Sequence, residues 1–160
     1  MKNKLASNEQ SDTDLESRGL SDYAPYLMNR IMHRYNQSLQ AVMAEQGLSI
    51  SKMRTLAALA ANGALTVNEL TVIAVSEQST MSRTLDQLQR DGLIVRTPNE
   101  KDSRVRVIEL TNSGRNLFRR IWPEMHAAEE ALFARISPKQ RAAFIDTLSQ
   151  ILMNIRQHDF

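Results

Sequence analysis

The amino-acid sequence predicts a mostly α-helical chain that carries one small β-hairpin. Most of the chain places apolar residues at three- and four-residue steps, which is the spacing of a helix that buries one face. Between residues 93 and 110, two short β-branched stretches are separated by turn-forming residues. With 160 residues, 42% of them hydrophobic, the chain can bury a core as one domain or two tightly joined small ones.

Composition narrows the setting and the chemistry. The chain has no cysteine, so it forms no disulfide and senses no oxidant through a thiol, and its composition fits a reducing cytosol. We find no run of about 18 apolar residues that would cross a membrane. The N-terminus is polar and lacks the apolar segment of a signal peptide. We therefore expect a cytoplasmic protein without a membrane partner.

The chain begins with a polar tail and a long helix. Residues 1–20 are polar with scattered apolar side chains, which predicts a disordered tail. The alternative is an arm that reaches a dimer partner. The first helix is expected over about residues 22–45, because Leu27, Ile31 and Leu39 fall on one face. Methionines widen this apolar stripe, which indicates burial against more than one small domain.

Two short helices follow. Ser49 begins the first of them, which ends before Gly63. The residues from Thr66 to Glu69 form a capping box, in which the threonine oxygen and the glutamate carboxylate each satisfy a free N–H of the first turn. A tight junction at residues 74–76 then leads into another helix, as in a helix-turn-helix, although this turn lacks the usual glycine.

The helix after this junction carries the polar groups that DNA recognition requires. We expect Ser76 to cap it and Gly92 to end it. Apolar residues lie on one face, and the other face carries uncharged hydrogen-bonding groups and one arginine, which suit base edges in a major groove. These polar residues are Gln78, Ser79, Thr80, Ser82, Arg83 and Gln87. The alternative is a solvent-exposed face without a partner.

A basic hairpin follows this helix. Strands are predicted over residues 93–97 and 105–110, with turn-forming residues from Pro98 to Asp102 between them. The net charge is only +2, and residues 66–110 hold 6 basic and 7 acidic side chains, so position rather than total charge must favour DNA. The hairpin concentrates Arg96, Lys101, Arg104 and Arg106. A helix-turn-helix followed by such a hairpin is a winged helix-turn-helix.

At these residues the chain resembles the MarR family of transcriptional regulators. Asp102-Ser103-Arg104, then Leu110-Thr111 and Gly114, are similar to the family's D-x-R and L-T-x-x-G signature, and the polar helix face fits its recognition helix. The similarity in element order covers about residues 22–158. It implies that Arg104 enters a minor groove and that Asp102 orients this basic loop by an ion pair. The alternative for Asp102 is a turn-forming role. Lys101 and Arg106 are expected to meet phosphates or solvent. Ser76 is expected to join the DNA-facing residues unless it is only a cap.

The C-terminal part predicts two more helices. Thr111 caps the first, over about residues 112–135, and Ser137-Pro138-Lys139-Gln140 is a strong start signal for the last. Neither end of the chain can build its own core, so both are expected to pack together and against a second copy. We expect a winged helix-turn-helix domain over residues 48–111 and an α-helical dimerisation region formed by both termini, residues 21–47 and 112–160. The family resemblance implies the same organisation.

Family members often bind small aromatic or anionic molecules between these regions. The residues that could approach such an effector here are Tyr26, Arg30, His33, Met53 and Arg54. The alternative is that they belong to the core or to the solvated surface.

Enzyme chemistry is not indicated. The three histidines are far apart, none has metal-ligand spacing, and there is no glycine-rich phosphate loop or nucleophile motif. We therefore expect no catalytic residue, metal or cofactor. The rival hypothesis is a winged-helix protein-interaction module that never touches DNA. We favour a homodimeric repressor that reads a pseudo-palindromic operator with half-sites about 10 base pairs apart and is released by a small effector.

Overall fold

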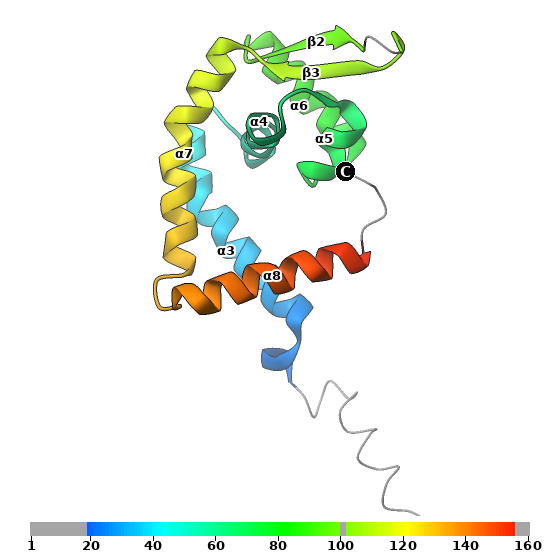
Figure 1. Cartoon of the computed structure of the whole chain (residues 1–160). Helices are drawn as coiled ribbons and strands as arrows, with labels where there is room; N and C mark the ends of the chain where they lie inside the picture. Colours follow the sequence, from blue (N-terminus) through cyan, green and yellow to red (C-terminus); the bar gives the residue numbers. More distant parts are fainter. Residues whose placement is uncertain (1–18, 100–101, 156–160) are drawn as a thin grey trace, which may run out of the picture. The chain divides into compact units, whose positions relative to one another are not determined.

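The computed structural model describes residues 19–99 and 102–155 (Figure 1). The chain divides into two compact units, Met1–Ser38 and Leu39–Phe160. The first unit holds the short 3₁₀ helix η1 (Leu20–Asp22) and most of α3 (Ala24–Glu45), whose last turns belong to the second unit. Most of the tail predicted over residues 1–20 lies outside the described residues. Within the described ranges, no helix is long and apolar enough to span a membrane.

The first unit is a helix that exposes its apolar stripe. α3 begins two residues later than predicted, because residues 20–22 form η1 instead. Leu27 and Ile31 are 40% and 44% exposed in the single chain. Further along α3, in the second unit, Leu39 and Met43 are fully buried.

Helix α4 (Ile50–Asn62) confirms the predicted start and stop signals. The hydroxyl of Ser49 accepts a hydrogen bond from the Lys52 N–H at 3.2 Å. Gly63 ends the helix with a positive φ of 78°, which favours glycine. The inward residues of α4 are buried as the periodicity predicts: Met53, Leu56 and Leu59.

A three-stranded antiparallel sheet contains the predicted hairpin. Its order is β1 (Leu65–Thr66), β3 (Arg106–Leu110), β2 (Ile94–Pro98), and β2 pairs with β3 from Ile94↔Leu110 to Pro98↔Arg106. Figure 1 shows β2 and β3 side by side as one projecting hairpin. The sequence does not predict β1, because two residues are too short to show a strand periodicity. Ile108, at the centre of the sheet, is completely buried.

The helix-turn-helix consists of α5 (Val67–Ile73) and α6 (Gln78–Arg90). The capping box is confirmed: the Thr66 N–H donates to Glu69 Oε2 at 2.6 Å, and the Glu69 N–H donates to Thr66 Oγ1 at 3.3 Å. The buried face of α6 is also confirmed, and it consists of Met81, Leu85 and Leu88 with Thr84.

The prediction that Ser76 caps α6 is wrong. The N-cap residue is Glu77, and the Ser76 hydroxyl instead donates to the Glu77 carbonyl at 3.3 Å. The cause is the preceding turn, where Val75 has a positive φ of 52° and the Ser76 N–H bonds back to the Thr71 carbonyl. Val75 stands where this turn favours glycine, at a cost of about 1–2 kcal/mol for a residue with a side chain.

Helix α7 (Asn112–Leu132) is anchored to the end of α6 by the L-T-x-x-G segment. Thr111 Oγ1 donates to the Gly92 carbonyl at 2.7 Å and accepts from the Gly114 N–H at 3.0 Å, which confirms the predicted cap. A Cβ on Gly114 would lie 2.1 Å from the Leu93 carbonyl oxygen. Glycine is therefore required sterically where α7 passes this loop.

The core of the second unit lies where α4, α5, α6 and the first half of α7 meet the sheet. Leu117 and Ile121 are the α7 residues buried there. Beyond them α7 continues through Pro123 and ends three residues earlier than predicted.

Helix α8 (Pro138–Ile155) begins at the predicted signal. The Ser137 N–H donates to Gln140 Oε1 at 3.1 Å, and the Gln140 N–H donates to Ser137 Oγ at 3.3 Å. Unlike the other helices of this unit, α8 has no buried residue.

Candidate nucleic-acid interface

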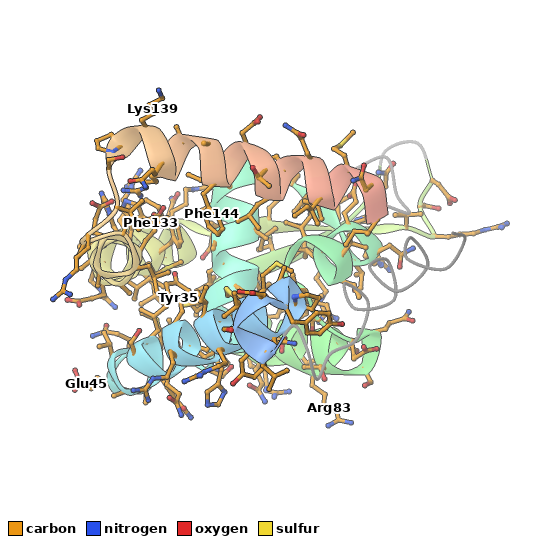
Figure 2. The ribbon with its side chains drawn as sticks, turned by 90° about the horizontal axis from the view of Figure 1, so that it is seen from below. Tyr35, Glu45, Arg83, Phe133, Lys139 and Phe144 are labelled. Atoms are coloured by element: carbon orange, nitrogen blue, oxygen red, sulfur yellow. The ribbon has the colours of Figure 1, made fainter. Side chains whose placement is uncertain are left out.

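The outward face of α6 presents the polar side chains that the sequence singled out. The exposed residues are Gln78, Ser79, Thr80, Ser82, Arg83 and Gln87. Figure 2 shows the Arg83 side chain extending away from the ribbon into open space. The opposite face is fixed to α4 through a hydrogen bond of 2.9 Å between Thr84 Oγ1 and Ser51 Oγ. The buried face of α6 is thus attached to α4, while its polar face remains exposed. Ser76 lies half-buried just before the helix.

The turn between β2 and β3 is shaped by Asp102. Its Oδ1 accepts a hydrogen bond of 2.9 Å from the backbone N–H of Arg104, and its own N–H donates to Asn99 Oδ1 at 3.3 Å. Among the described residues, no ion pair joins Asp102 to the Arg104 guanidinium. These two hydrogen bonds agree with the turn-forming alternative for Asp102. Lys101 lies outside the described residues.

A groove of about 790 Å³ connects the start of α6 to the turn end of the β2–β3 hairpin. Gln78 lines it from the recognition helix, and Arg104 and Arg106 line it from the hairpin. Val105 also lines it from the hairpin, and the rest of the wall comes from α5 and its N-cap residue: Thr66, Val67, Asn68, Glu69, Thr71 and Val72. One concave surface therefore unites polar groups of the helix with two arginines of the wing.

Several acidic side chains of this region are engaged by neighbouring residues. Asp86 on α6 pairs with Arg96 on β2 at 2.6 Å, and Asp91 pairs with Lys52 on α4 at 2.8 Å. The Glu69 carboxylate is engaged in the capping box. These acids are paired with neighbours inside the winged helix-turn-helix region, residues 48–111, which we call the winged lobe.

The same pairing corrects one expectation about the wing. Arg96 was grouped with the basic residues of the hairpin, but it joins β2 to the recognition helix through Asp86. The sequence could not show this pair, because both residues are separately compatible with an exposed surface. Arg83, Arg104 and Arg106 are left with their side chains exposed.

The residues suggested for an effector fall in two groups. Tyr26, Arg30 and His33 belong to the first unit, where Arg30 Nη1 donates to the Tyr26 hydroxyl at 3.3 Å and its guanidinium lies 5.7 Å from the ring centroid. Met53 and Arg54 belong to the second unit. Met53 is only 2% exposed and is a core residue, as its alternative proposed, whereas Arg54 is half-buried on α4. In the described part of the chain, no three His, Asp or Glu side chains are grouped to hold a metal ion.

The structure contains a capped helix-turn-helix and a basic hairpin. An ion pair joins them, and both line one groove. This arrangement defines a winged helix-turn-helix protein of the DNA-binding class. The sequence model of the MarR family matches residues 46–105. A crystal structure of a MarR-family transcriptional regulator from Silicibacter pomeroyi is 47% identical to the chain, with a TM-score of 0.86, and the match covers 92% of this chain and 99% of that one. The chain therefore belongs to the MarR family, and it is a DNA-binding transcriptional regulator.

Two further relatives are similar over most of their length. The HTH-type transcriptional repressor IacR of Pseudomonas putida is 25% identical over 82% of this chain and 76% of its own length. The structure of the MepR–DNA complex of S. aureus is 25% identical, with a TM-score of 0.71, over 84% of this chain and 96% of that one.

Proposed function

We propose that the protein is a homodimeric repressor that binds a specific duplex operator and is released by a small molecule. The groove that joins Gln78 of α6 to Arg104 and Arg106 of the wing carries this proposal. A sugar-phosphate backbone lying in this groove would place α6 in a major groove and the wing at the adjacent minor groove. The similarity to a regulator solved with DNA supports the same use of the fold.

The proposed roles follow from the chemistry of each side chain. Arg83 can pair with guanine through two hydrogen bonds, and Gln78 or Gln87 can do so with adenine. Arg104 suits a narrow A·T-rich minor groove, where negative potential is concentrated. Arg106 and Lys101 would neutralise phosphates. Asp102 would act indirectly, by shaping the turn that presents Arg104.

The dimer is supported by the uncovered apolar surface at the C-terminal end. Trp122 on α7 is 47% exposed, and α8 exposes Phe144, Ile145, Ile151, Leu152, Met153 and Ile155. We assign residues 21–47 and 112–160 to the dimerisation region and residues 48–111 to DNA binding. Two lobes related by a two-fold axis would read half-sites about 10 base pairs apart.

Release by an effector follows from family membership. An effector shifts the protein away from DNA only if it binds the other arrangement of the two lobes more tightly. Arg30 beside the Tyr26 ring offers a cation and an aromatic face, which suit an aromatic or anionic molecule. We also propose that the protein is not an enzyme and that it acts in the cytoplasm, where its operator DNA would be.

A binding titration tests the proposal. The purified protein is titrated against its own upstream DNA and against a shuffled duplex of equal length, at several salt concentrations. We expect a preference for the native fragment and an affinity that falls steeply with salt, because phosphate contacts release counterions. Equal binding to both duplexes at every salt concentration, together with no preferred sequence in a genome-wide selection, would favour the protein-interaction alternative.

A further inference from the structure

The recognition helix begins with an exposed carboxylate. Glu77 is the N-cap residue of α6, with φ −72° and ψ 146°, and its side chain makes no capping hydrogen bond. Its carbonyl accepts the Met81 N–H at 2.8 Å, so the backbone at this position is fixed by the helix. Within the part of the chain that the structure describes, the Glu77 carboxylate has neither a hydrogen-bond nor an ion-pair partner.

Other acidic residues of this lobe behave differently. Asp86 and Asp91 are held in ion pairs, Glu69 is held in the capping box, and Asp102 accepts from a backbone N–H. Glu77 is thus a free carboxylate next to Gln78, which lines the groove. Glu109 is also exposed, but it lies on β3 rather than at the start of α6.

A free carboxylate at the leading end of a DNA-reading helix is costly near phosphates unless it meets a hydrogen-bond donor. The partial positive charge of the helix N-terminus offsets part of this repulsion. In the major groove, the donors are the N4 amine of cytosine and the N6 amine of adenine, and carboxylates suit the cytosine amine. Guanine and the O4 of thymine present acceptors, which a carboxylate repels.

We propose that Glu77 determines specificity by accepting a hydrogen bond from the N4 amine of a cytosine in each half-site. The inference rests on the proposed DNA-binding function of α6. In this arrangement Glu77 selects one base by attraction and disfavours bases that present acceptors at the same place. Glu77 would then increase discrimination between bases rather than the overall affinity for DNA.

The test compares Glu77→Ala and Glu77→Gln with the wild-type full-length chain. Each protein selects duplexes from a library with a randomised segment, and the bound sequences give the base preference at every position. The wild type is expected to favour cytosine by about 10- to 100-fold at one symmetry-related position. Glu77→Ala should lose this preference. Glu77→Gln should shift it toward adenine, because glutamine pairs with adenine through two hydrogen bonds.

Glu109→Gln is the matched control, since it removes the same charge from an exposed site on β3 rather than at the start of α6. It should leave the base preference unchanged at every position. Thermal unfolding monitored by circular dichroism verifies that each variant is folded, and the conservative Glu77→Gln change keeps the helix start polar. Two independent substitutions therefore report on the same side chain.

Two results would overturn the inference. If both Glu77 variants bind all sequences more tightly by one common factor and keep the wild-type base preference, Glu77 is only a repulsive charge. If they match wild type in both respects, Glu77 does not face the bases. In either case a sequence-selective wild type leaves the proposed function standing, whereas a wild type that selects no sequence removes both.

Discussion

The winged lobe and helix α8 belong to one compact unit but differ in how they use their apolar residues. In the lobe, Leu56, Leu70, Met81 and Ile108 are all fully buried. In α8 no residue is buried, and Leu152 remains 62% exposed. The lobe is complete as a single chain, whereas α8 leaves its apolar face to be covered by another surface. Under the proposed function, DNA reading and assembly would use separate parts of the fold.

Ion pairs and aromatic contacts join α7 to α8. Arg141 near the start of α8 donates to Glu130 at 2.5 Å and to Glu129 at 2.7 Å, both near the end of α7. Its guanidinium also lies 4.6 Å from the Phe133 ring centroid, and the Phe133 and Phe144 rings meet edge to face with centroids 6.0 Å apart (Figure 2). This corner fixes α8 to α7 without burying the rest of α8.

The largest effect is expected from Leu152→Asp, which places a charge on the uncovered face of α8. The variant should sediment as a monomer, because a charge opposes burial of that face. Its affinity for a two-half-site operator should fall by about 100-fold or more through lost bivalency. Asn154→Asp adds the same charge to the same helix and is the control. If Leu152→Asp remains a dimer with unchanged affinity, the assembly surface lies elsewhere.

Gly114→Ala is expected to destabilise the winged lobe rather than the proposed assembly surface. The new Cβ would lie 2.1 Å from the Leu93 carbonyl oxygen, so the α7 backbone must move. We expect a loss of about 1–3 kcal/mol in the free energy of unfolding, measured by urea denaturation. Ser113→Ala, at the exposed neighbouring position, should change it little. Equal stability of the two variants would show that the close approach at Gly114 is relaxed in solution.

The Asp86–Arg96 pair tests whether Arg96 positions the wing against α6 or contacts DNA directly. Asp86→Asn and Arg96→Met should each weaken DNA binding modestly, by up to about 1 kcal/mol for a partly exposed pair, because each frees the wing from α6. The double variant should resemble either single one. A double-mutant cycle in binding titrations measures this coupling. A loss confined to Arg96→Met would instead make Arg96 a direct phosphate contact.

The smallest effect concerns the corner between α7 and α8. The hydrogen bond from Arg141, together with its charge, lowers the pKa of Glu130 below the ordinary value. The stabilisation from this pair is therefore present above the pKa that Glu130 has in the unfolded chain, and it is lost as the pH falls through the folded value. Arg141→Met should raise the pKa of Glu130 toward the ordinary value in an NMR titration. An unchanged pKa would mean that the pair does not persist in solution.

Local signals predicted much of this fold. Ser49, Thr66, Thr111 and Ser137 were all expected to begin helices, and each is a helix cap, because capping depends on a few adjacent residues. The predicted cap at Ser76 was wrong, because the local backbone there differs from an ordinary helix start. The positive φ of Val75 moved the helix start by one residue, and sequence periodicity does not report backbone angles.

The residues of the candidate site were harder to predict from the sequence than the fold. The exposed polar face of α6 was readable, because it needs only helical spacing. The pairing of Arg96 with Asp86 and the free carboxylate of Glu77 depend on how a strand and a turn meet the helix. The covered core position of Met53 was likewise compatible with a ligand site until its burial was known.

A hydroxyl-radical footprint on the selected operator tests most directly whether α6 and the wing read one duplex together. The wild type should protect two half-sites about 10 base pairs apart, together with the sugars of the minor grooves beside them. Arg104→Ala should lose the minor-groove protection, most of all on A·T-rich flanks, and keep the half-sites. Identical footprints for the two proteins would contradict a wing that enters the minor groove.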